Sequence, residues 1–480
     1  MKCGFGKTEL YGVFRAEWEY GTPLYCRMLY LEQGGKRALI CALDLAGTFH
    51  TEARRFIEEL STRTGIPQKS IWYHELQIHA TVGGDVICGE TMDKLISRCA
   101  AEADAVIARA EECECFACDA DMGCEYTMNR EQYVKDIGGV TVWRGLRFDK
   151  NGVPFTRDKS VMLLRGYEKY LPELNENVYF DNAVDQKAYL FVFKNKSGAV
   201  LGTVSRFAAH PDVAVLFEHS ENPERLKEYH YDYDWPGYMN EILEERFGGT
   251  GVYLNGPCAD LAVKKDCTNK GTYAASAEEC RRIAGLISEK LISDFNKNAR
   301  RVDTSETFDT ATYEIFLPMK DDFPRSHAAA RESGARVEKA QRELDKAVEE
   351  KRPASEIKRL IDERWRAGHL ESMVFYSGGY TEEELASRFV PVQVTALKFG
   401  GYLFVGLPGE SLVDMTLWLR SEFTGEKTVP VDQVNGYYNY LATPRSLTLG
   451  GYTYWASFVS REAIPRLKRE LYPLLKDFLD

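Results

Sequence analysis

Four short segments of the sequence contain residue types that can bind a metal ion or transfer protons. The first is YHELQIHATVGG at residues 73–84, in which His74 and His79 flank a glutamate. A zinc-binding helix of the H-E-x-x-H type needs its two histidines four residues apart on one face, and here they are five apart. The segment therefore does not fit a metalloprotease helix.

The residue types around this segment favour a β-strand over residues 70–80, because aromatic and β-branched side chains are frequent there. In a strand, residues at even spacing share a face, which puts Glu75, Gln77 and His79 together and His74 on the other face. His74 and His79 are therefore not expected to bind one ion. His79 is expected near the carboxyl end of the strand, where α/β sheets collect their ligands.

The other three segments each place one polar side chain next to an expected strand or turn. RFAAHPD ends a strand at His210, and GLPGES places Glu410 after a strand at the expected start of a helix. NGYYNYLATPRSLTLGGYTYW contains Tyr440 and Tyr452. Each has a structural alternative: a packed core histidine, a carboxylate stabilised by the helix dipole, and tyrosines that only fill space.

The elements that must position these residues alternate between strands and helices, which predicts an α/β fold with mixed β-sheets flanked by helices. Parallel pairing is expected in the first hundred residues. The predicted strands and helices of that region lie at residues 27–33, 37–45, 51–65, 70–80 and 90–112. Strand and helix patterns return after residue 390 and end in a helix at 461–479.

One segment stands apart, because residues 323–369 are highly charged and carry apolar residues at helical spacing on both sides of Pro353. We interpret it as a helical hairpin inserted into a single domain that spans residues 1–480. Its charges are expected to form a solvated face, with a partner or lid surface as the alternative.

The composition limits the classes of function. The net charge of -12 gives no reason to expect a nucleic-acid partner, since such proteins concentrate positive charge. There is no secretory h-region at the N-terminus and no apolar run of about 18 residues that could span a bilayer. Twelve cysteines without an export signal predict reduced thiols and a cytoplasmic protein.

Taken together, the four segments resemble the catalytic domain of the neutral/alkaline ceramidase family. Their order matches that family, as do GFGKTEL near the N-terminus, LYCRMLYLEQGGKRALICALDLAG, TMNRE around Asn129 and Arg130, and AVDQKAYLFVFKNKSG. The resemblance spans nearly the whole chain, and each motif by itself is moderately specific.

The resemblance implies a zinc amidohydrolase whose metal is held by two histidines, a glutamate and a tyrosine. Carried over by motif, three of these ligands are His210, Glu410 and Tyr440. Tyr452 falls where the family keeps a second tyrosine that supports the reacting carbonyl. The family's T-H-T-H reads L-Q-I-H here, so that the metal-binding histidine is replaced by Gln77 and the second histidine is kept as His79.

This replacement leaves three possibilities, because a neutral amide oxygen is a weaker zinc donor than imidazole. Gln77 could bind the metal weakly, His79 could supply the missing imidazole, or the site binds no zinc. A second departure lies at YLNGPCADLA, where Cys258 stands near the position of a serine in true ceramidases. Sphingolipid specificity is therefore not assumed, and Cys258 is either a nucleophile or, as we prefer, a buried structural thiol.

We expect a metal-dependent hydrolase of an amide or ester bond in a small or acylated substrate. A metal would activate a water, Arg130 and Tyr452 would stabilise the negative charge on the carbonyl oxygen, and His79 would supply the leaving group's proton unless it is itself a ligand. The alternative is a non-catalytic ligand-binding homologue that has lost the metal.

Overall fold

The computed structural model describes residues 1–14, 19–83, 86–134, 136–141, 170, 178–179, 183–215, 230–264, 272–304, 308–332, 335–371, 378–425 and 427–480. Its largest sheet has nine strands, in the order β14-β12-β11-β6-β1-β3-β4-β5, with β16 paired to β6. The bounds of these strands are β1 (Lys2–Glu9), β3 (Tyr25–Gln33), β4 (Lys36–Leu43), β5 (Ile71–Glu75), β6 (Glu111–Asp121), β11 (Lys187–Asn195), β12 (Val200–Phe207), β14 (Thr250–Asn255) and β16 (Arg300–Arg301).

Four strands form a second sheet, in the order β17-β18-β19-β21. They are β17 (Asp309–Pro318), β18 (Phe389–Phe399), β19 (Tyr402–Gly406) and β21 (Lys427–Val431). Short strands form small ladders beside the two sheets: β2 (Glu19–Tyr20) with β13 (His230–Tyr231), β7 (Thr127–Asn129) with β15 (Leu261–Val263), β8 (Glu131–Val134) with β9 (Gly138–Thr141) and β10 (Val178–Tyr179), and β20 (Glu410–Ser411) with β22 (Tyr440–Leu441).

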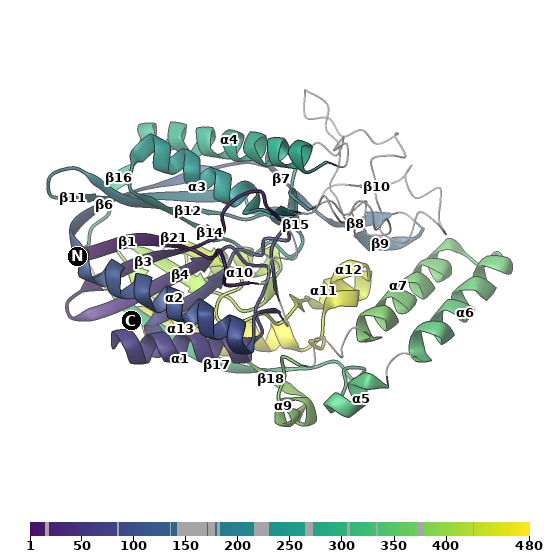
Figure 1. Cartoon of the computed structure of the whole chain (residues 1–480). Coiled ribbons are helices and arrows are strands. Elements are labelled where there is room, and N and C mark those ends of the chain that lie inside the picture. Colours follow the sequence, from purple (N-terminus) through teal and green to yellow (C-terminus); the bar gives the residue numbers. More distant parts are fainter. Residues whose placement is uncertain are drawn as a thin grey trace.

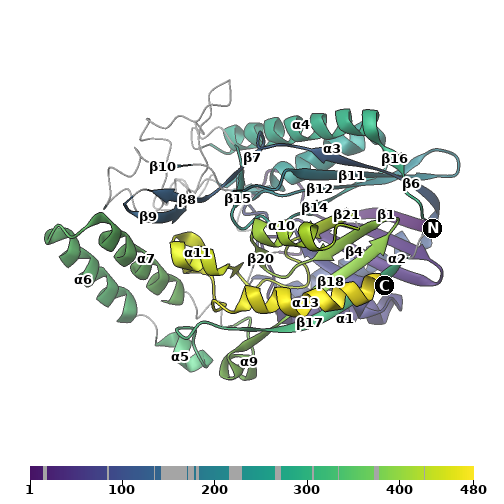
Figure 2. The same cartoon turned by 180° about the vertical axis from the view of Figure 1, so that it is seen from behind.

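Helices cover the outer faces of the two sheets (Figures 1 and 2). The first sheet carries α1 (His50–Thr64), α2 (Gly89–Ala108), α3 (Asp234–Phe247) and α4 (Tyr273–Asn298). The second sheet carries α9 (Glu382–Ser387), α10 (Val413–Glu422) and α13 (Ala463–Leu479). Two short helices, α11 (Pro444–Leu449) and α12 (Tyr452–Ala456), follow β22, and η1 (Gln68–Ser70) is a 3-10 turn before β5.

Aromatic side chains join the two sheets. The ring centroids of Phe191 on β11 and Phe404 on β19 are 5.3 Å apart, and Phe399 lies 6.1 Å from the same ring of Phe191. Aromatic pairs at such separations add attraction beyond the apolar area that they bury. The interface between the sheets is therefore part of one continuous core, and the α/β fold class with mixed sheets that the sequence predicts is confirmed.

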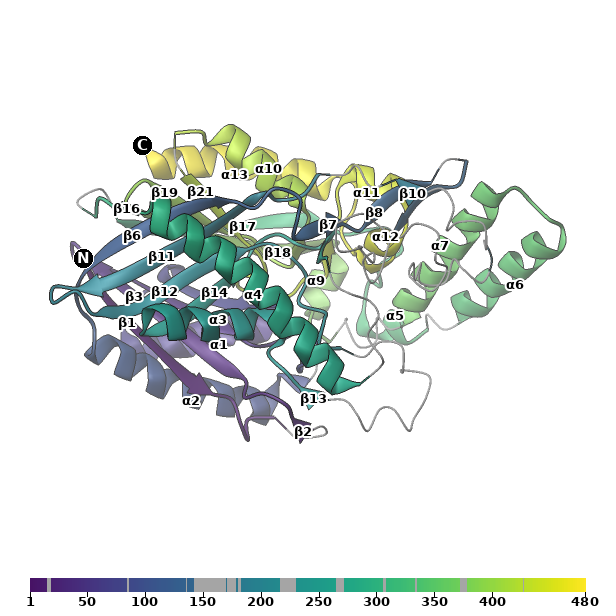
Figure 3. The ribbon, with the colours of Figure 1, turned by 90° about the horizontal axis from the view of Figure 1, so that it is seen from above.

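The charged segment forms α5 (His327–Arg331), α6 (Ala335–Glu349) and α7 (Ala354–Glu371), which lie to one side of the sheets (Figure 3). Pro353 precedes α7, in the position where a missing N–H costs nothing. Ile361 is fully buried together with Trp455 of α12, and Trp365 stacks on Trp455 with ring centroids 5.3 Å apart. One face of the pair of helices is thus attached to the region that follows β22.

Two details of the expected strand pattern are wrong. β5 ends at Glu75 instead of reaching residue 80, because Gln77 adopts a left-handed backbone conformation with φ of 61°. Pairing near the N-terminus is mainly antiparallel, since β1 pairs with β3 and β3 with β4 through a tight turn at Gly34 and Gly35. Of the pairs formed among β1, β3, β4 and β5, only β4–β5 is parallel.

In the described part of the chain, no helix combines the length and the apolar character that crossing a bilayer requires.

A buried ion-pair group links β12 to α10. Asp185 is fully buried and bonds to Arg206 of β12, which is also fully buried, and to Arg420 of α10 at 2.5 Å. Burial alone would raise the pKa of Asp185, but the two arginines, Arg206 first, lower it to about 2. The carboxylate therefore stabilises the fold wherever it is ionised.

Replacing this carboxylate by Asp185→Asn should lower the free energy of unfolding at pH 7 by about 2.5 kcal/mol, because the pKa falls by nearly two units on folding. The difference from the wild type should shrink as the pH falls below about 4 and vanish only below about 2, where the native carboxylate is itself protonated. Urea unfolding across this pH range measures it. The exposed Asp121, 3.9 Å from Lys187, provides the control Asp121→Asn, which should change stability little.

Candidate metal and hydrolase site

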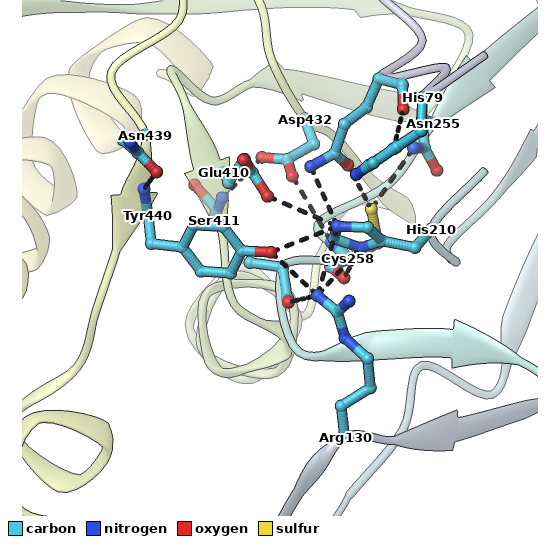
Figure 4. A network of polar contacts seen from close by, with 12 residues as sticks. His79, Arg130, His210, Asn255, Cys258, Glu410, Ser411, Asp432, Asn439 and Tyr440 are labelled. Carbon is cyan, nitrogen blue, oxygen red and sulfur yellow. Dashed lines mark hydrogen bonds and ion pairs between the residues drawn. The ribbon is translucent and has the colours of Figure 1, made fainter. Parts of the chain in front are cut away.

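Loops after three strands and one pair of short strands bring predicted site residues to one place (Figure 4). His210 follows β12, and its backbone N–H donates to Leu261 O at 3.0 Å, which pins the loop beside β15. Arg130 lies between β7 and β8, and Gln77 follows β5. Glu410 and Tyr440 face each other as register partners in the parallel pair β20–β22.

The sequence predicted Glu410 at the start of a helix, and this prediction is wrong. Glu410 belongs to β20, and α10 begins only at Val413. Gly409 makes this geometry possible, since its φ is 56° and a Cβ there would lie 2.9 Å from Asn439 O. The carboxylate is therefore held by strand pairing and does not act as a helix cap.

His210 is the centre of the cluster. Its Nδ1 lies 2.7 Å from the carbonyl oxygen of Cys258. A carbonyl only accepts hydrogen bonds, so Nδ1 carries the ring proton and Nε2 presents its lone pair to the other residues. The main-chain contact thus fixes both the orientation and the tautomer of the imidazole.

Four polar atoms surround Nε2 of His210. Nε2 of Gln77 and a terminal nitrogen of Arg130 each lie 3.2 Å away, Oη of Tyr440 lies 3.3 Å away, and Oε2 of Glu410 lies 3.5 Å away. Arg130 also donates to Oη of Tyr440 at 2.9 Å and to Ala259 O. All five side chains are buried, so their interactions are strong in this water-poor environment.

Burial sets the protonation states of the cluster. It lowers the pKa of His210, and the charge of Arg130 lowers that pKa further. The pKa of His79 falls to about 4, first through burial and then through His210. Burial raises the pKa of the Tyr440 phenol well above its ordinary value, although Arg130 acts in the opposite direction. Near pH 7 both histidines are therefore neutral, which is the form that can bind a cation or accept a proton.

The two remaining predicted residues lie beside this cluster. The His79 ring is 5.3 Å from the His210 ring, and its Nδ1–H donates to the backbone carbonyl of Gln77 at 2.9 Å. The Tyr452 ring meets the Tyr440 ring edge-on, with centroids 5.2 Å apart. The structure thus brings together the side chains predicted as metal ligands or catalytic groups, with His79 and Tyr452 packed beside the central cluster, whereas Glu75 turns to Thr48.

Some participating residues were missed by sequence reasoning. Tyr437 donates to Oε1 of Glu410 at 3.1 Å, and Asp432 is a buried carboxylate that accepts from the backbone N–H of Ser411 at 3.0 Å. Burial raises the pKa of Asp432 well above its ordinary value. Tyr437 belongs to the NGYYNY motif and could have been suspected, whereas nothing near Asp432 in the sequence indicates its role.

The separations within the cluster fit the donor set of a tetrahedral zinc ion. Zn–N and Zn–O bonds of about 2.0–2.2 Å place neighbouring donors about 3.3–3.6 Å apart. Nε2 of His210 lies at such distances from Oη of Tyr440 and Oε2 of Glu410. Oε2 of Glu410 is buried and accepts no hydrogen bond from the described residues, whereas Nε2 of His210 already accepts from Arg130 and Gln77. A cation between these atoms would satisfy the carboxylate oxygen and would take the place of Arg130 and Gln77 at Nε2.

The same cluster is poor in the strongest metal ligands. Among the described residues, no group of three or more histidine, cysteine, aspartate and glutamate side chains is arranged to hold a metal ion. His210 and Glu410 are the two such residues in the cluster, and its other members are Tyr440, Gln77 and the cation Arg130. Gln77 turns its NH2 group towards His210, so it would have to rotate before its oxygen could bind a metal.

The arrangement of sheets and helices defines a ceramidase-like fold. It resembles neutral ceramidase from Pseudomonas aeruginosa with a TM-score of 0.62 at 13% sequence identity, over 98% of this chain and 73% of that chain. A second solved structure, a ceramidase complexed with C2, gives a TM-score of 0.62 at 12% identity, over 98% of this chain and 74% of that one. No family model and no curated protein sequence matches the chain. The ceramidase-like fold that the motifs predicted is therefore confirmed.

Proposed function

We propose that the protein is a zinc-dependent hydrolase that cleaves an amide or ester bond of an acylated substrate. The observation that carries this proposal is that Oε2 of Glu410 and Oη of Tyr440 both lie within 3.5 Å of Nε2 of His210. The similarity in fold to a neutral ceramidase supports the proposal. His210, Glu410 and Tyr440 would hold the ion, with Gln77 or His79 as the fourth ligand.

A zinc ion in this position would polarise a substrate carbonyl and lower the pKa of a water molecule. The protein supplies the remaining groups for hydrolysis. Arg130 is a fixed cation beside Tyr440, where it can donate to the carbonyl oxygen as negative charge develops. Tyr452, next to Tyr440, would orient the same carbonyl.

His79 is suited to the transfer of the proton. Its Nδ1–H is committed to the carbonyl of Gln77, so Nε2 is the basic atom, and the ring is neutral near pH 7. It can take a proton from water as the oxygen attacks the carbonyl carbon. It can then deliver that proton to the leaving nitrogen or oxygen as the bond to carbon breaks, so that an acid and an amine or alcohol are released.

A second function is favoured by one observation. Arg130 and the NH2 group of Gln77 both donate to Nε2 of His210, which satisfies the histidine without a metal. A homologue that binds an acylated ligand without cleaving it would have this arrangement. The number of cysteines is consistent with a reducing, cytoplasmic location for either function.

Metal analysis combined with a hydrolysis assay separates the two functions. Purified protein is stripped with a chelator, incubated with zinc and dialysed, and then tested on fluorogenic N-acyl amides and esters. We expect about one equivalent of zinc to be retained and hydrolysis to depend on it. Absence of both zinc retention and zinc-dependent hydrolysis would contradict the proposed enzyme and favour the ligand-binding homologue.

A further inference from the structure

Cys258 contacts two residues of the site through two different groups. Its carbonyl oxygen accepts the Nδ1–H of His210 at 2.7 Å, and its thiol lies 3.1 Å from Oε1 of Gln77. The residue is fully buried and lies in the loop between β14 and β15. Its backbone N–H faces the carboxylate of Asp432 at 3.4 Å, which holds the loop against the end of β21.

The direction of each hydrogen bond around Cys258 can be worked out from backbone carbonyl oxygens, which only accept. Nδ2 of Asn255 lies 3.4 Å from Leu76 O and 3.3 Å from Sγ of Cys258, so it donates to both. The sulfur therefore accepts from Asn255 and directs its own proton to Oε1 of Gln77. The amide of Gln77 then presents its NH2 group to the lone pair on Nε2 of His210.

This chain of hydrogen bonds runs in one direction from Asn255 through Cys258 and Gln77 to His210, and it returns to the carbonyl of Cys258. Reversing the amide of Gln77 would place its NH2 beside a sulfur that is a weak acceptor. It would also place its oxygen lone pair against that of His210. Only a cation near Nε2 would make the reversed orientation favourable.

We propose that Cys258 is a positioning residue of this site. Its carbonyl sets the ring of His210, and its thiol holds the oxygen of Gln77 away from the metal position until the amide turns. The inference rests on the proposed function for its effect on zinc, but the positioning of Gln77 does not depend on zinc. Cys258 is thus neither a nucleophile nor a mere core thiol.

The effect on zinc is tested by a double-mutant cycle. Cys258→Ala removes the donor that holds the amide, so it should tighten zinc binding about three- to tenfold, as measured by competition with a chromophoric chelator. Cys258→Ser keeps a donor and should bind zinc like the wild type. In the Gln77→His background, Cys258→Ala should have no effect, because the amide on which the thiol acts is gone.

Cys280 provides the matched control. It is also fully buried, and its thiol lies 3.6 Å from Asp234, outside the site. Cys280→Ala should leave zinc affinity unchanged. If Cys258→Ala changes affinity equally with glutamine and with histidine at position 77, or not at all in a protein that binds zinc, the positioning role is refuted.

The S–H stretching band provides a test that needs no metal. The band of Cys258 is identified in the infrared difference between the wild type and Cys258→Ala, both stripped of metal. Because the thiol donates to Gln77, the band should move to higher frequency in Gln77→Met, whose thioether accepts only weakly. An unmoved band would overturn the proposal. A shifted band in a protein that retains no zinc would support it and contradict only the metal-dependent function.

Discussion

Replacing His210 with alanine should abolish zinc retention and any zinc-dependent hydrolysis. His210 supplies an imidazole nitrogen that lies within 3.5 Å of both Glu410 and Tyr440. Loss of residues that merely support metal ligands already weakens binding about 10- to 100-fold, so loss of this ligand should weaken it by more than about 100-fold. Zinc titration and the fluorogenic assay measure both effects.

His230 provides a control of the same residue type. It lies in β13, its side chain is 23% exposed, and its ring stacks on Tyr273 away from the cluster. His230→Ala should keep both zinc binding and hydrolysis. Thermal unfolding of both variants distinguishes loss of a ligand from loss of the fold. A folded His210→Ala protein that binds zinc as the wild type does would refute the proposed ligand set.

Replacing Gln77 with histidine should tighten zinc binding by about ten- to a hundredfold and raise hydrolysis. Imidazole is a stronger donor to zinc than an amide oxygen, and it needs no rotation away from Cys258. The backbone at this position is left-handed, with φ of 61°, and histidine tolerates that conformation better than most residues with a Cβ. The change should therefore be compatible with the fold.

Zinc affinity and the hydrolysis rate are measured for Gln77→His beside Gln68→His, which introduces a histidine at an exposed position in η1. The control should behave as the wild type. If Gln77→His binds zinc tightly but does not hydrolyse any substrate, the chain lacks catalytic groups other than metal ligands, and a ligand-binding function becomes the better proposal. If zinc affinity does not rise at all, the placement of Gln77 in the metal site is contradicted.

Local sequence patterns were sufficient for most elements, for physical reasons that can be named. The strands predicted at 27–33 and 37–45 correspond to β3 and β4, and the helices predicted at 51–65, 90–112 and 461–479 correspond to α1, α2 and α13, because short apolar runs and helical apolar spacing are local signals. The strand ending at Glu75 was predicted too long, since the left-handed residue that ends it is a glutamine and not a glycine.

The identities of the site residues could be predicted, but their contacts could not. His210, Glu410, Tyr440 and Gln77 come from motifs that together resemble a family, and the fold of the chain agrees with that resemblance. The placement of Glu410 in a strand depends on its pairing with Tyr440, which lies 30 residues further along the chain (440 − 410). Such pairing is decided by tertiary packing and leaves no local signal.

By itself, the sequence determined which side chains are available for chemistry and which elements carry them, because residue type and apolar periodicity act over short distances. Only the tertiary structure decided the tautomer of His210, the direction of the Gln77 amide and the part played by Cys258. Each of these depends on hydrogen bonds between segments that are far apart in the chain. Their directions are settled by backbone carbonyls, and a carbonyl is present in every residue and therefore invisible in a sequence pattern.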